Sequence, residues 1–327
     1  SASSTPFTAL LVDISDEDNR SKIVGIVWSM LMVGIIIGAI TSSGLLRQIQ
    51  LNAPIEVIQT QVNRLFTIIP LVAFLLCLIG TVGVEKKYSR MSIRSVPTVR
   101  EDKITLGHAL TILTASRQTG IFFTFLLVMT ISLFMQDAVM EPYGGEVFKM
   151  TIAETTKLNA FFGTGTLLGL GLTGIFIAPR LGKKTTTKLG CIGVAICFIL
   201  LIFAGVTANS KVLQLCLVLF GFASGVTTTG ALSLMLDLTA AEAAGTFVGA
   251  WGLAQAMSRA LATVSGGAVL NFGKYLFNIP LMSYGLVFTV QAIGMIVALS
   301  FLARVNVSEF QRDAKHTMVS ILEQELD

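Results

Sequence analysis

The stretch DISDEDNRSKIVGIVWSMLMVGIIIGAITSSGLL, Asp13–Leu46, decides the fold. It is a charged connector followed by a long apolar run, and a degraded copy, DLTAAEAAGTFVGAWGLAQAMSRALATVSGGAVL, recurs 224 positions later as Asp237–Leu270. Identities are few, but both copies have an aspartate, a short polar connector and a span rich in small residues. The two tryptophans of the chain, Trp28 and Trp251, fall one position apart in this register. A long-period repeat predicts a membrane protein built from two similar halves.

The composition is that of a membrane protein rather than a soluble domain. Hydrophobic residues make up 53% of the 327 residues, charged residues only 13%, and the mean hydropathy is +0.78. Apolar windows of about 20 residues predict membrane-spanning helices. The sequence contains eight such windows: 24–46, 65–84, 119–140, 158–179, 186–207, 212–236, 244–270 and 280–303. We therefore expect an all-α polytopic membrane helix bundle.

The first twelve residues are apolar but too few to span a bilayer. In the repeat register they pair with 225–236, the second half of a span. The sequence therefore predicts that the chain starts inside a helix and that N-terminal helices are missing, which leaves about eight complete spans.

Glycines at four-residue spacing predict close helix packing. Gly34 and Gly38 lie in the first full span, and Gly221 and Gly225 in a later one. Small residues at this spacing let helix backbones approach each other closely.

Positive charges divide unequally between the two sides of the predicted spans. One side carries sixteen Lys and Arg residues and the other six, while Arg259 lies within a span. The excess predicts that the connector 13–22, the loop 85–117 and the C-terminus face the cytoplasm. The net charge of +4 then reflects topology, and no basic patch with interleaved aromatic residues indicates nucleic-acid binding.

The four cysteines all lie in apolar spans, and the chain has only two histidines. These residues predict buried free thiols rather than a disulfide framework or a zinc site.

The longest polar segment divides the chain. Its part 104–113 has the apolar spacing of an amphipathic helix at the membrane surface and carries His108. We predict four regions: 1–84, a cytoplasmic linker at 85–118, a six-helix half at 119–303 and a cytoplasmic tail at 304–327.

An unusual stretch, MQDAVMEPYGGEVFKM, follows at Met135–Met150. Asp137 and Glu141 are one helical turn apart, so a continuous helix would place both carboxylates on one face near the outer membrane boundary. A solvated helix end and a carboxylate site for a cation, a proton or a metal-centred pigment both stay open.

The same stretch contains residues that break helices. We expect Pro142 to end the helix and Gly144-Gly145 to turn the chain, which would leave Glu146 in a loop.

Arg259 lies well inside the apolar span 244–270, which also holds Gln255. A charged side chain at such a position is costly and is by default a functional hypothesis. It needs a partner, and both a structural ion pair and a ligand contact stay open. Gln291 in the last span is a second buried polar candidate.

The loop Arg180-Leu181-Gly182-Lys183-Lys184 resembles the D-R-x-G-R-K loop of the major facilitator superfamily. Pro179 stands where the motif has aspartate, so the chain departs from the motif there. The acidic connector from Asp13 to Arg20 resembles the loop between helices four and five of that fold. The resemblance implies that 1–84 holds the end of helix four and helices five and six, and that the later spans are helices seven to twelve.

A narrower resemblance rests on MQDAVMEPYGGEVF, Met135–Phe148, and SSTPFTALLVDISDEDNRSKIVG, Ser3–Gly25. Both stretches resemble the bacteriochlorophyll delivery family of PucC-type proteins, and the resemblance covers essentially the whole chain. It implies an assembly factor that handles or delivers (bacterio)chlorophyll. The implied partners are photosystem or light-harvesting subunits and chlorophyll synthase. The second stretch resembles the branch from oxygenic phototrophs, which implies a thylakoid location.

Chlorophyll needs an axial ligand for its Mg²⁺, which favours oxygen donors, although imidazole also serves. The resemblance implies Glu141, Asp137 and Gln136 as candidates, with His108 as a further one. Glu141 and Asp137 are the stronger candidates because they belong to the family-like stretch.

Two other functions stay open. A secondary transporter would use Arg259 and the carboxylates at a midplane site, and a structural subunit would only associate with a photosystem. The sequence contains no P-loop, G-x-G-x-x-G, G-x-S-x-G or HExxH motif, so we expect no enzymatic activity.

Overall fold

The computed structural model describes residues 20–46, 54–81, 117–237, 244–306 and 309 of the chain. Over these residues it contains helices and no strand, so the all-α polytopic bundle is confirmed. Six helices in the described ranges are long and apolar enough to cross a membrane: Ile55–Ile79, Gly120–Ala138, Ile152–Leu181, Lys183–Thr207, Ser210–Met235 and Pro280–Arg304. The other two predicted spans are also helical, as α2 (Arg20–Leu45, 26 residues) and α12 (Ala244–Leu276, 33 residues).

The chain forms two compact units. Unit 1 comprises Ser1–Asp102 with Thr151–Ala160, and unit 2 comprises Lys103–Met150 with Phe161–Asp327. Helix α8 (Ile152–Leu172) begins in unit 1 and ends in unit 2. The four predicted regions stay a prediction.

In unit 1, helix α3 (Ile55–Thr81) begins ten residues before the predicted span 65–84. Residues 55–64, which lie between the predicted spans 24–46 and 65–84, are therefore helical as well. Apolar side chains recur at helical spacing in this part of the chain and pack against Leu46 and Ala153. The helix therefore begins before the predicted membrane span. The residues of this contact are Ile58, Val62 and Leu65.

Helix α2 contacts the start of α8 within unit 1. The Ser43 hydroxyl donates a hydrogen bond of 2.6 Å to the carbonyl oxygen of Ala153. The close helix approach predicted at Gly34 and Gly38 is not observed, because a Cβ at either position would meet no described atom within 4 Å.

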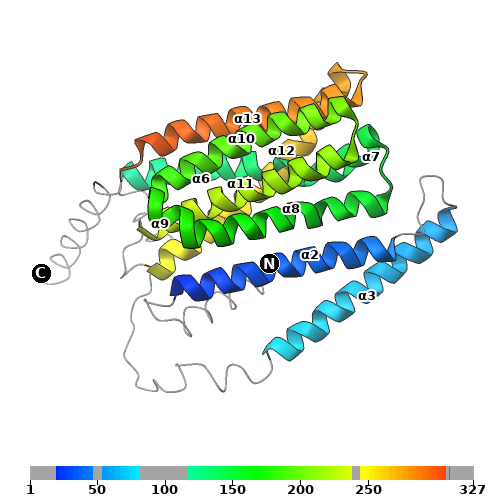
Figure 1. The fold of residues 1–327 in the computed structure, drawn as a ribbon, viewed down its shortest axis with the longest axis horizontal. Coiled ribbons are helices and arrows are strands. Elements are labelled where there is room, and N and C mark those ends of the chain that lie inside the picture. The colour runs from blue at the N-terminus through cyan, green and yellow to red at the C-terminus, as the bar shows by residue number, and fades with distance from the viewer. Residues whose placement is uncertain (1–19, 47–53, 82–116, 238–243, 307–308, 310–327) are drawn as a thin grey trace, which may run out of the picture. The chain divides into compact units, whose positions relative to one another are not determined.

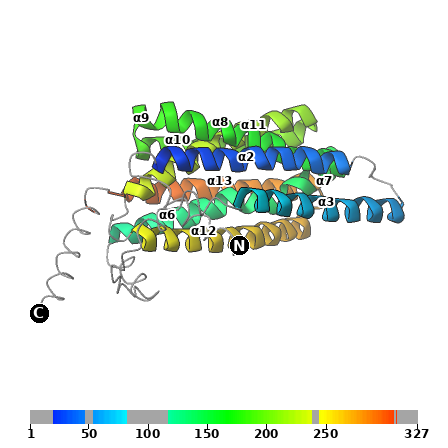
Figure 2. The ribbon, with the colours of Figure 1, turned by 90° about the horizontal axis from the view of Figure 1, so that it is seen from below.

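Unit 2 is built from helices that run side by side, as Figures 1 and 2 show. Its elements are α6 (Arg117–Phe134), the 3₁₀ helix η2 (Met135–Ala138), α7 (Met140–Phe148), the later part of α8, the π-helical turn η3 (Thr173–Ile177), α9 (Ala178–Leu181), α10 (Lys183–Thr207), α11 (Ser210–Asp237), α12 and α13 (Pro280–Arg304). Helix α10 packs against α11 and α13, and α6 packs against α12 and α13. These contacts place the end of α6 against α12, where the candidate site lies.

Helices α8 and α11 cross closely because glycines face the opposite backbone. A Cβ on Gly165 would overlap the carbonyl oxygen of Val218, and a Cβ on Gly221 would overlap that of Phe162. A Cβ on Gly225 would lie 2.7 Å from the carbonyl oxygen of a residue on α8. The close packing that the Gly221 and Gly225 spacing predicts is therefore confirmed.

The loop before α10 requires glycine at one position. Gly182 has φ 78° and ψ 152°, a conformation essentially restricted to glycine. In the next turn, Lys184 Nζ donates to the carbonyl oxygens of Ala303 (3.1 Å) and Val305 (2.6 Å). The lysine thus satisfies carbonyl groups at the end of α13 and complements the partial negative charge there.

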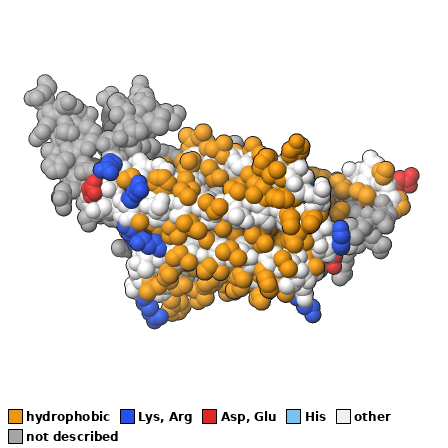
Figure 3. All heavy atoms as spheres, turned by 90° about the horizontal axis from the view of Figure 1, so that it is seen from above, with side chains coloured by type: hydrophobic (Ala, Val, Ile, Leu, Met, Phe, Trp, Pro, Cys, Tyr) orange, Lys and Arg blue, Asp and Glu red, His pale blue; other side chains and the backbone are white. Residues whose placement is uncertain are grey.

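Hydrophobic side chains cover much of the face that Figure 3 shows, with Lys and Arg toward its two ends. On α10 and α13 the exposed apolar residues include Ile192, Ile196, Ile199, Phe203, Ile293 and Ile296. Such a surface suits contact with lipid chains.

Candidate functional site

The stretch Met135–Phe148 forms two short helices rather than one helix that ends at Pro142. Helix α6 gives way at Phe134 to the 3₁₀ turn η2, and α7 then runs from Met140 to Phe148. The predicted end at Pro142 is wrong because proline stands in the first turn of α7, where its missing N–H leaves no helical hydrogen bond unmade.

The predicted turn at Gly144-Gly145 is also wrong. Both glycines are helical, as is Glu146, and the chain turns at Lys149, whose φ is 56°. Met150 N donates to the carbonyl oxygen of Gly144 at 3.2 Å and so closes the end of α7.

Tyr143 anchors α7 in the core of unit 2. Its side chain is fully buried, and its hydroxyl donates 2.7 Å to the carbonyl oxygen of Leu201 on α10. The ring packs against Phe148, Tyr284 and Phe288 with centroids 5.0–5.3 Å apart. Burial raises the pKa of the Tyr143 phenol, so the group stays protonated and continues to donate. This residue of the family-like stretch is therefore structural.

Replacing Tyr143 with phenylalanine should lower the free energy of unfolding by about 1 kcal/mol, because it removes one buried hydrogen bond and keeps the ring. Thermal unfolding of the purified protein in detergent measures the change. Tyr275, whose side chain is 88% exposed, supplies the control variant Tyr275→Phe, which should leave stability unchanged. Equal effects of the two variants would contradict the anchoring role.

The carboxylates of the stretch separate into different surroundings. Glu146 pairs with Lys274 near the end of α12, with Nζ and Oε1 2.7 Å apart and both side chains about half exposed. Glu141 in the first turn of α7 and Asp137 in η2 are both exposed, but they belong to different helices. The break between the two helices means that Asp137 and Glu141 do not share one helix face, as the sequence predicted.

Arg259 of α12 lies against Phe134, three residues before Asp137. The guanidinium carbon of Arg259 is 3.9 Å from the centroid of the Phe134 ring, a short cation–π contact. The charge of Arg259 also acts on Asp137, and Gln136 Nε2 donates to Asp137 Oδ1 at 2.7 Å. The structure thus brings together two features that the sequence showed separately, the intramembrane arginine and the oxygen donors Gln136 and Asp137. We call Phe134, Gln136, Asp137 and Arg259 the α6–α12 cluster.

The α6–α12 cluster lies at the end of α6 and against the middle of α12. Arg259 is the sixteenth of the 33 residues of α12, so it stands roughly 22 to 26 Å from each helix end. On α13, Gln291 is the twelfth of 25 residues, and its Nε2 donates 2.9 Å to the carbonyl oxygen of Ser132, two residues before Phe134. Phe134 and Arg259 therefore lie near mid-height.

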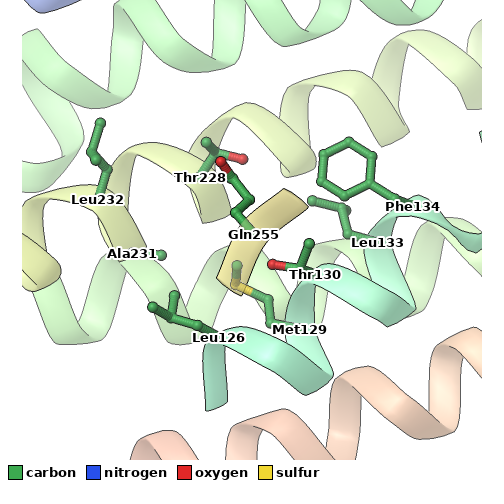
Figure 4. Close-up of a pocket in the computed structure, with 9 residues that line it drawn as sticks. All are labelled: Leu126, Met129, Thr130, Leu133, Phe134, Thr228, Ala231, Leu232 and Gln255. Carbon is green, nitrogen blue, oxygen red and sulfur yellow. The ribbon is translucent and has the colours of Figure 1, made fainter. Parts of the chain in front are cut away.

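A small pocket adjoins the cluster between α6, α11 and α12 (Figure 4). Its volume is about 20 Å³, room for about one water molecule. The polar groups on its wall are Thr130, Thr228 and Gln255, and the rest of the lining is apolar apart from backbone: Leu126, Met129, Leu133, Phe134, Ala231 and Leu232. We call it the Thr130 pocket.

The other predicted site residues lie apart from the cluster or outside the described ranges. His108 and Asp13 lie outside them, and Arg20 begins α2 in unit 1. Arg180 faces Phe176, with its guanidinium carbon 5.9 Å from the ring centroid. Lys183 starts α10 directly after Gly182.

Sequence reasoning missed the roles of Thr130 and Phe134. Thr130 and Phe134 share a face of α6, because they are four residues apart, and Asp137 follows in the 3₁₀ helix η2. The same spacing joins Gln255 to Arg259 on α12. The four-residue spacing was the available signal in the sequence. It was weak, because threonine and phenylalanine are ordinary residues in an apolar helix.

Comparison with known proteins identifies the family. The family model described as PUCC protein matches residues 1–310. The chain is 26% identical over 303 residues to "Protein PucC" of Rhodobacter capsulatus, covering 90% of this chain and 62% of that relative. It is 28% identical over 310 residues to "Bacteriochlorophyll synthase 44.5 kDa chain" of the same species, covering 91% and 67%. A "Protein PucC" of Cereibacter sphaeroides is 25% identical over 265 residues, covering 80% and 54%.

The matches thus extend along most of this chain, while the chain spans only about 54% to 67% of the relatives' own lengths. Because the family model covers nearly all of the sequence, the chain belongs to the PucC protein family.

Proposed function

We propose that this protein is a membrane assembly factor that handles (bacterio)chlorophyll and delivers it to photosynthetic pigment–protein complexes. The observation that carries the proposal is the α6–α12 cluster, which combines an oxygen donor, a cation and an aromatic ring at mid-height in a PucC-family chain. The name of one relative, "Bacteriochlorophyll synthase 44.5 kDa chain", contains the word bacteriochlorophyll. That name also contains the word synthase, so the absence of enzymatic activity stays a prediction.

The donors of the cluster suit the magnesium of chlorophyll. The described residues contain no group of three or more His, Cys, Asp and Glu side chains that could bind a metal by themselves. Magnesium in chlorophyll already has four ring nitrogens, so a single axial oxygen suffices. Asp137 offers carboxylate oxygens, which Mg²⁺ prefers, and Gln136 orients that carboxylate through its hydrogen bond.

The Thr130 pocket is too small for a chlorin ring, since it has room for about one water molecule. The ring would therefore lie against the outer faces of the helices. Arg259 is exposed there, and neighbouring positions on α12 expose the apolar side chains of Leu253, Met257 and Leu261. These side chains would supply apolar contacts, and Asp137 would supply the axial ligand.

An absorption spectrum of the protein purified in mild detergent, with co-purifying proteins identified alongside, tests the function. The proposal expects bound chlorophyll together with photosystem or light-harvesting subunits, and chlorophyll synthase is a further expected partner. By the same proposal the protein resides in a photosynthetic membrane, the thylakoid in an oxygenic organism, with its C-terminus in the cytoplasm. A colourless protein without such partners would remove the proposal.

Replacing Asp137 with alanine should remove most of the bound pigment, because it removes the proposed axial ligand. The ratio of pigment to protein in the absorption spectrum measures the loss. The matched control is Glu154→Ala, since Glu154 Oε2 only accepts hydrogen bonds from Thr151 at the start of α8. Equal pigment in wild type and Asp137→Ala would exclude Asp137 as the ligand.

Transport is the second candidate, favoured by the mid-height position of Arg259, where secondary transporters bind their substrates. A transporter would show solute flux into proteoliposomes that Arg259→Leu abolishes. An assembly factor would show no such flux and would co-purify with pigment.

A further inference from the structure

Two threonine hydroxyls in unit 2 differ from most of the others. Within the described helices, buried and exposed threonines commonly donate to the carbonyl four residues back; Thr227, for example, donates to Ala223 and Thr229 to Gly225. No hydrogen bond joins the hydroxyl of Thr130 or Thr228 to any described residue. Thr130 is nonetheless only 3% exposed. Neither hydroxyl is among the fully enclosed unpartnered atoms of the described residues, so both reach accessible space and are available to an occupant of the pocket that they line.

Gln255 adds a third group with hydrogen-bonding capacity. Its side chain has no hydrogen bond to a described residue and lies at the pocket between Thr228 and Thr130, as Figure 4 shows. Phe134, Thr228 and Gln255 are only half-buried, so the pocket opens between them. Arg259 contacts Phe134, which places the α6–α12 cluster beside this opening.

The lining sets the kind of atom that fits. The side chains of the pocket are neutral, and two hydroxyls and one amide can each donate a hydrogen bond as well as accept one. Neutral donors in an apolar wall suit a neutral acceptor, whereas a desolvated anion would need a full positive charge. The volume of about 20 Å³ admits one oxygen atom and excludes a ring.

We propose that the Thr130 pocket is a hydrogen-bond-donor subsite for the keto carbonyl oxygen of the pigment ring. This inference rests on the proposed function and names a contact that selects the pigment's orientation. Thr130 and Asp137 are seven residues apart, about 10 Å along the helix, so one macrocycle could engage both. A carbonyl oxygen has two lone pairs, so two of the three groups, the hydroxyls of Thr130 and Thr228 and the amide of Gln255, donate to it at a time while the ring stays outside the pocket.

The test is resonance Raman spectroscopy of chlorophyll a bound to the full chain, because a hydrogen bond lowers the stretching frequency of the keto group. The variants are Thr130→Val, Thr228→Val and Gln255→Leu, which remove donors with little change in size. The matched controls are Thr124→Val on α6 and Thr229→Val on α11, whose hydroxyls donate to Gly120 and Gly225 of their own helices. Circular dichroism checks that each variant is folded. Each of the three pocket variants tests the subsite separately, so the test stands if one of them fails to fold.

The inference expects a lowered keto frequency in wild type and in both controls, and a frequency shifted toward that of the free group in the pocket variants. Affinity for chlorophyll a should fall about three- to tenfold with each donor removed.

Pigment that binds wild type with a keto frequency unchanged by the pocket variants overturns the subsite and leaves the proposed function standing. The pocket would then hold an ordered water. A wild-type protein that binds no chlorophyll a overturns the proposed function and the subsite together.

Discussion

Replacing Gly165 with alanine is expected to destabilise unit 2 by about 3 kcal/mol, the upper part of the range for overpacked cores. The added Cβ would overlap the carbonyl oxygen of Val218 and lie 2.9 Å from the backbone nitrogen of Phe222. Backbone atoms of a helix cannot move aside as a side chain can, so α8 and α11 would have to separate along their crossing. Separation would also weaken the contact between the Phe162 and Phe220 rings, whose centroids are 5.3 Å apart.

Thermal unfolding and the yield of monodisperse protein in detergent measure this effect. Gly171→Ala is the matched control on the same helix, because a Cβ at Gly171 would meet nothing within 4 Å. Removing a helical glycine there should be neutral or stabilise by about 0.5 to 1 kcal/mol. Similar behaviour of the two variants would show that α8 and α11 do not pack through Gly165.

Replacing Arg259 with leucine is expected to cost about 1 to 2 kcal/mol, because it removes a cation that lies against an aromatic ring and whose charge acts on Asp137. That ring belongs to Phe134. The double variant Asp137→Asn/Arg259→Leu should recover most of the loss, since no charge is then left in the cluster. A double-mutant cycle of unfolding free energies measures the coupling.

The Glu146–Lys274 pair supplies the comparison for this cycle. Both of its side chains are about half exposed, so Lys274→Leu should cost less than about 1 kcal/mol. If Arg259→Leu costs no more than Lys274→Leu, and the double variant recovers nothing, Asp137 and Arg259 are not a functional pair at mid-height.

Helix identity was predictable from the sequence because apolar windows of bilayer length leave few alternatives to a helix. Helix ends were less predictable. Helix α3 begins as early as Ile55, because its apolar face packs against Leu46 and Ala153 although its other face carries polar residues. Pro142 was expected to end a helix and instead stands in the first turn of one, since the break falls a few residues earlier, in η2.

The site was predictable only in part. Arg259, Gln136 and Asp137 stood out by chemistry, because charges and amides are conspicuous in apolar spans. Their proximity depends on how α12 packs against the end of α6, which no local pattern encodes. The role of Tyr143 was hidden for the same reason, because its partners Leu201 and Tyr284 are distant in sequence.

The central claim is that Asp137 in the α6–α12 cluster binds the magnesium of chlorophyll. Its most direct test is a titration of the purified protein with chlorophyll a and with magnesium-free pheophytin a, using wild type, Asp137→Asn and Asp137→Leu. The account predicts that wild type prefers chlorophyll a by about tenfold or more, equivalent to about 1.4 kcal/mol. Asp137→Asn, which keeps an oxygen donor, should retain part of that preference, and Asp137→Leu should lose it. Equal affinity of wild type for the two pigments, or a preference that survives in Asp137→Leu, would contradict the account.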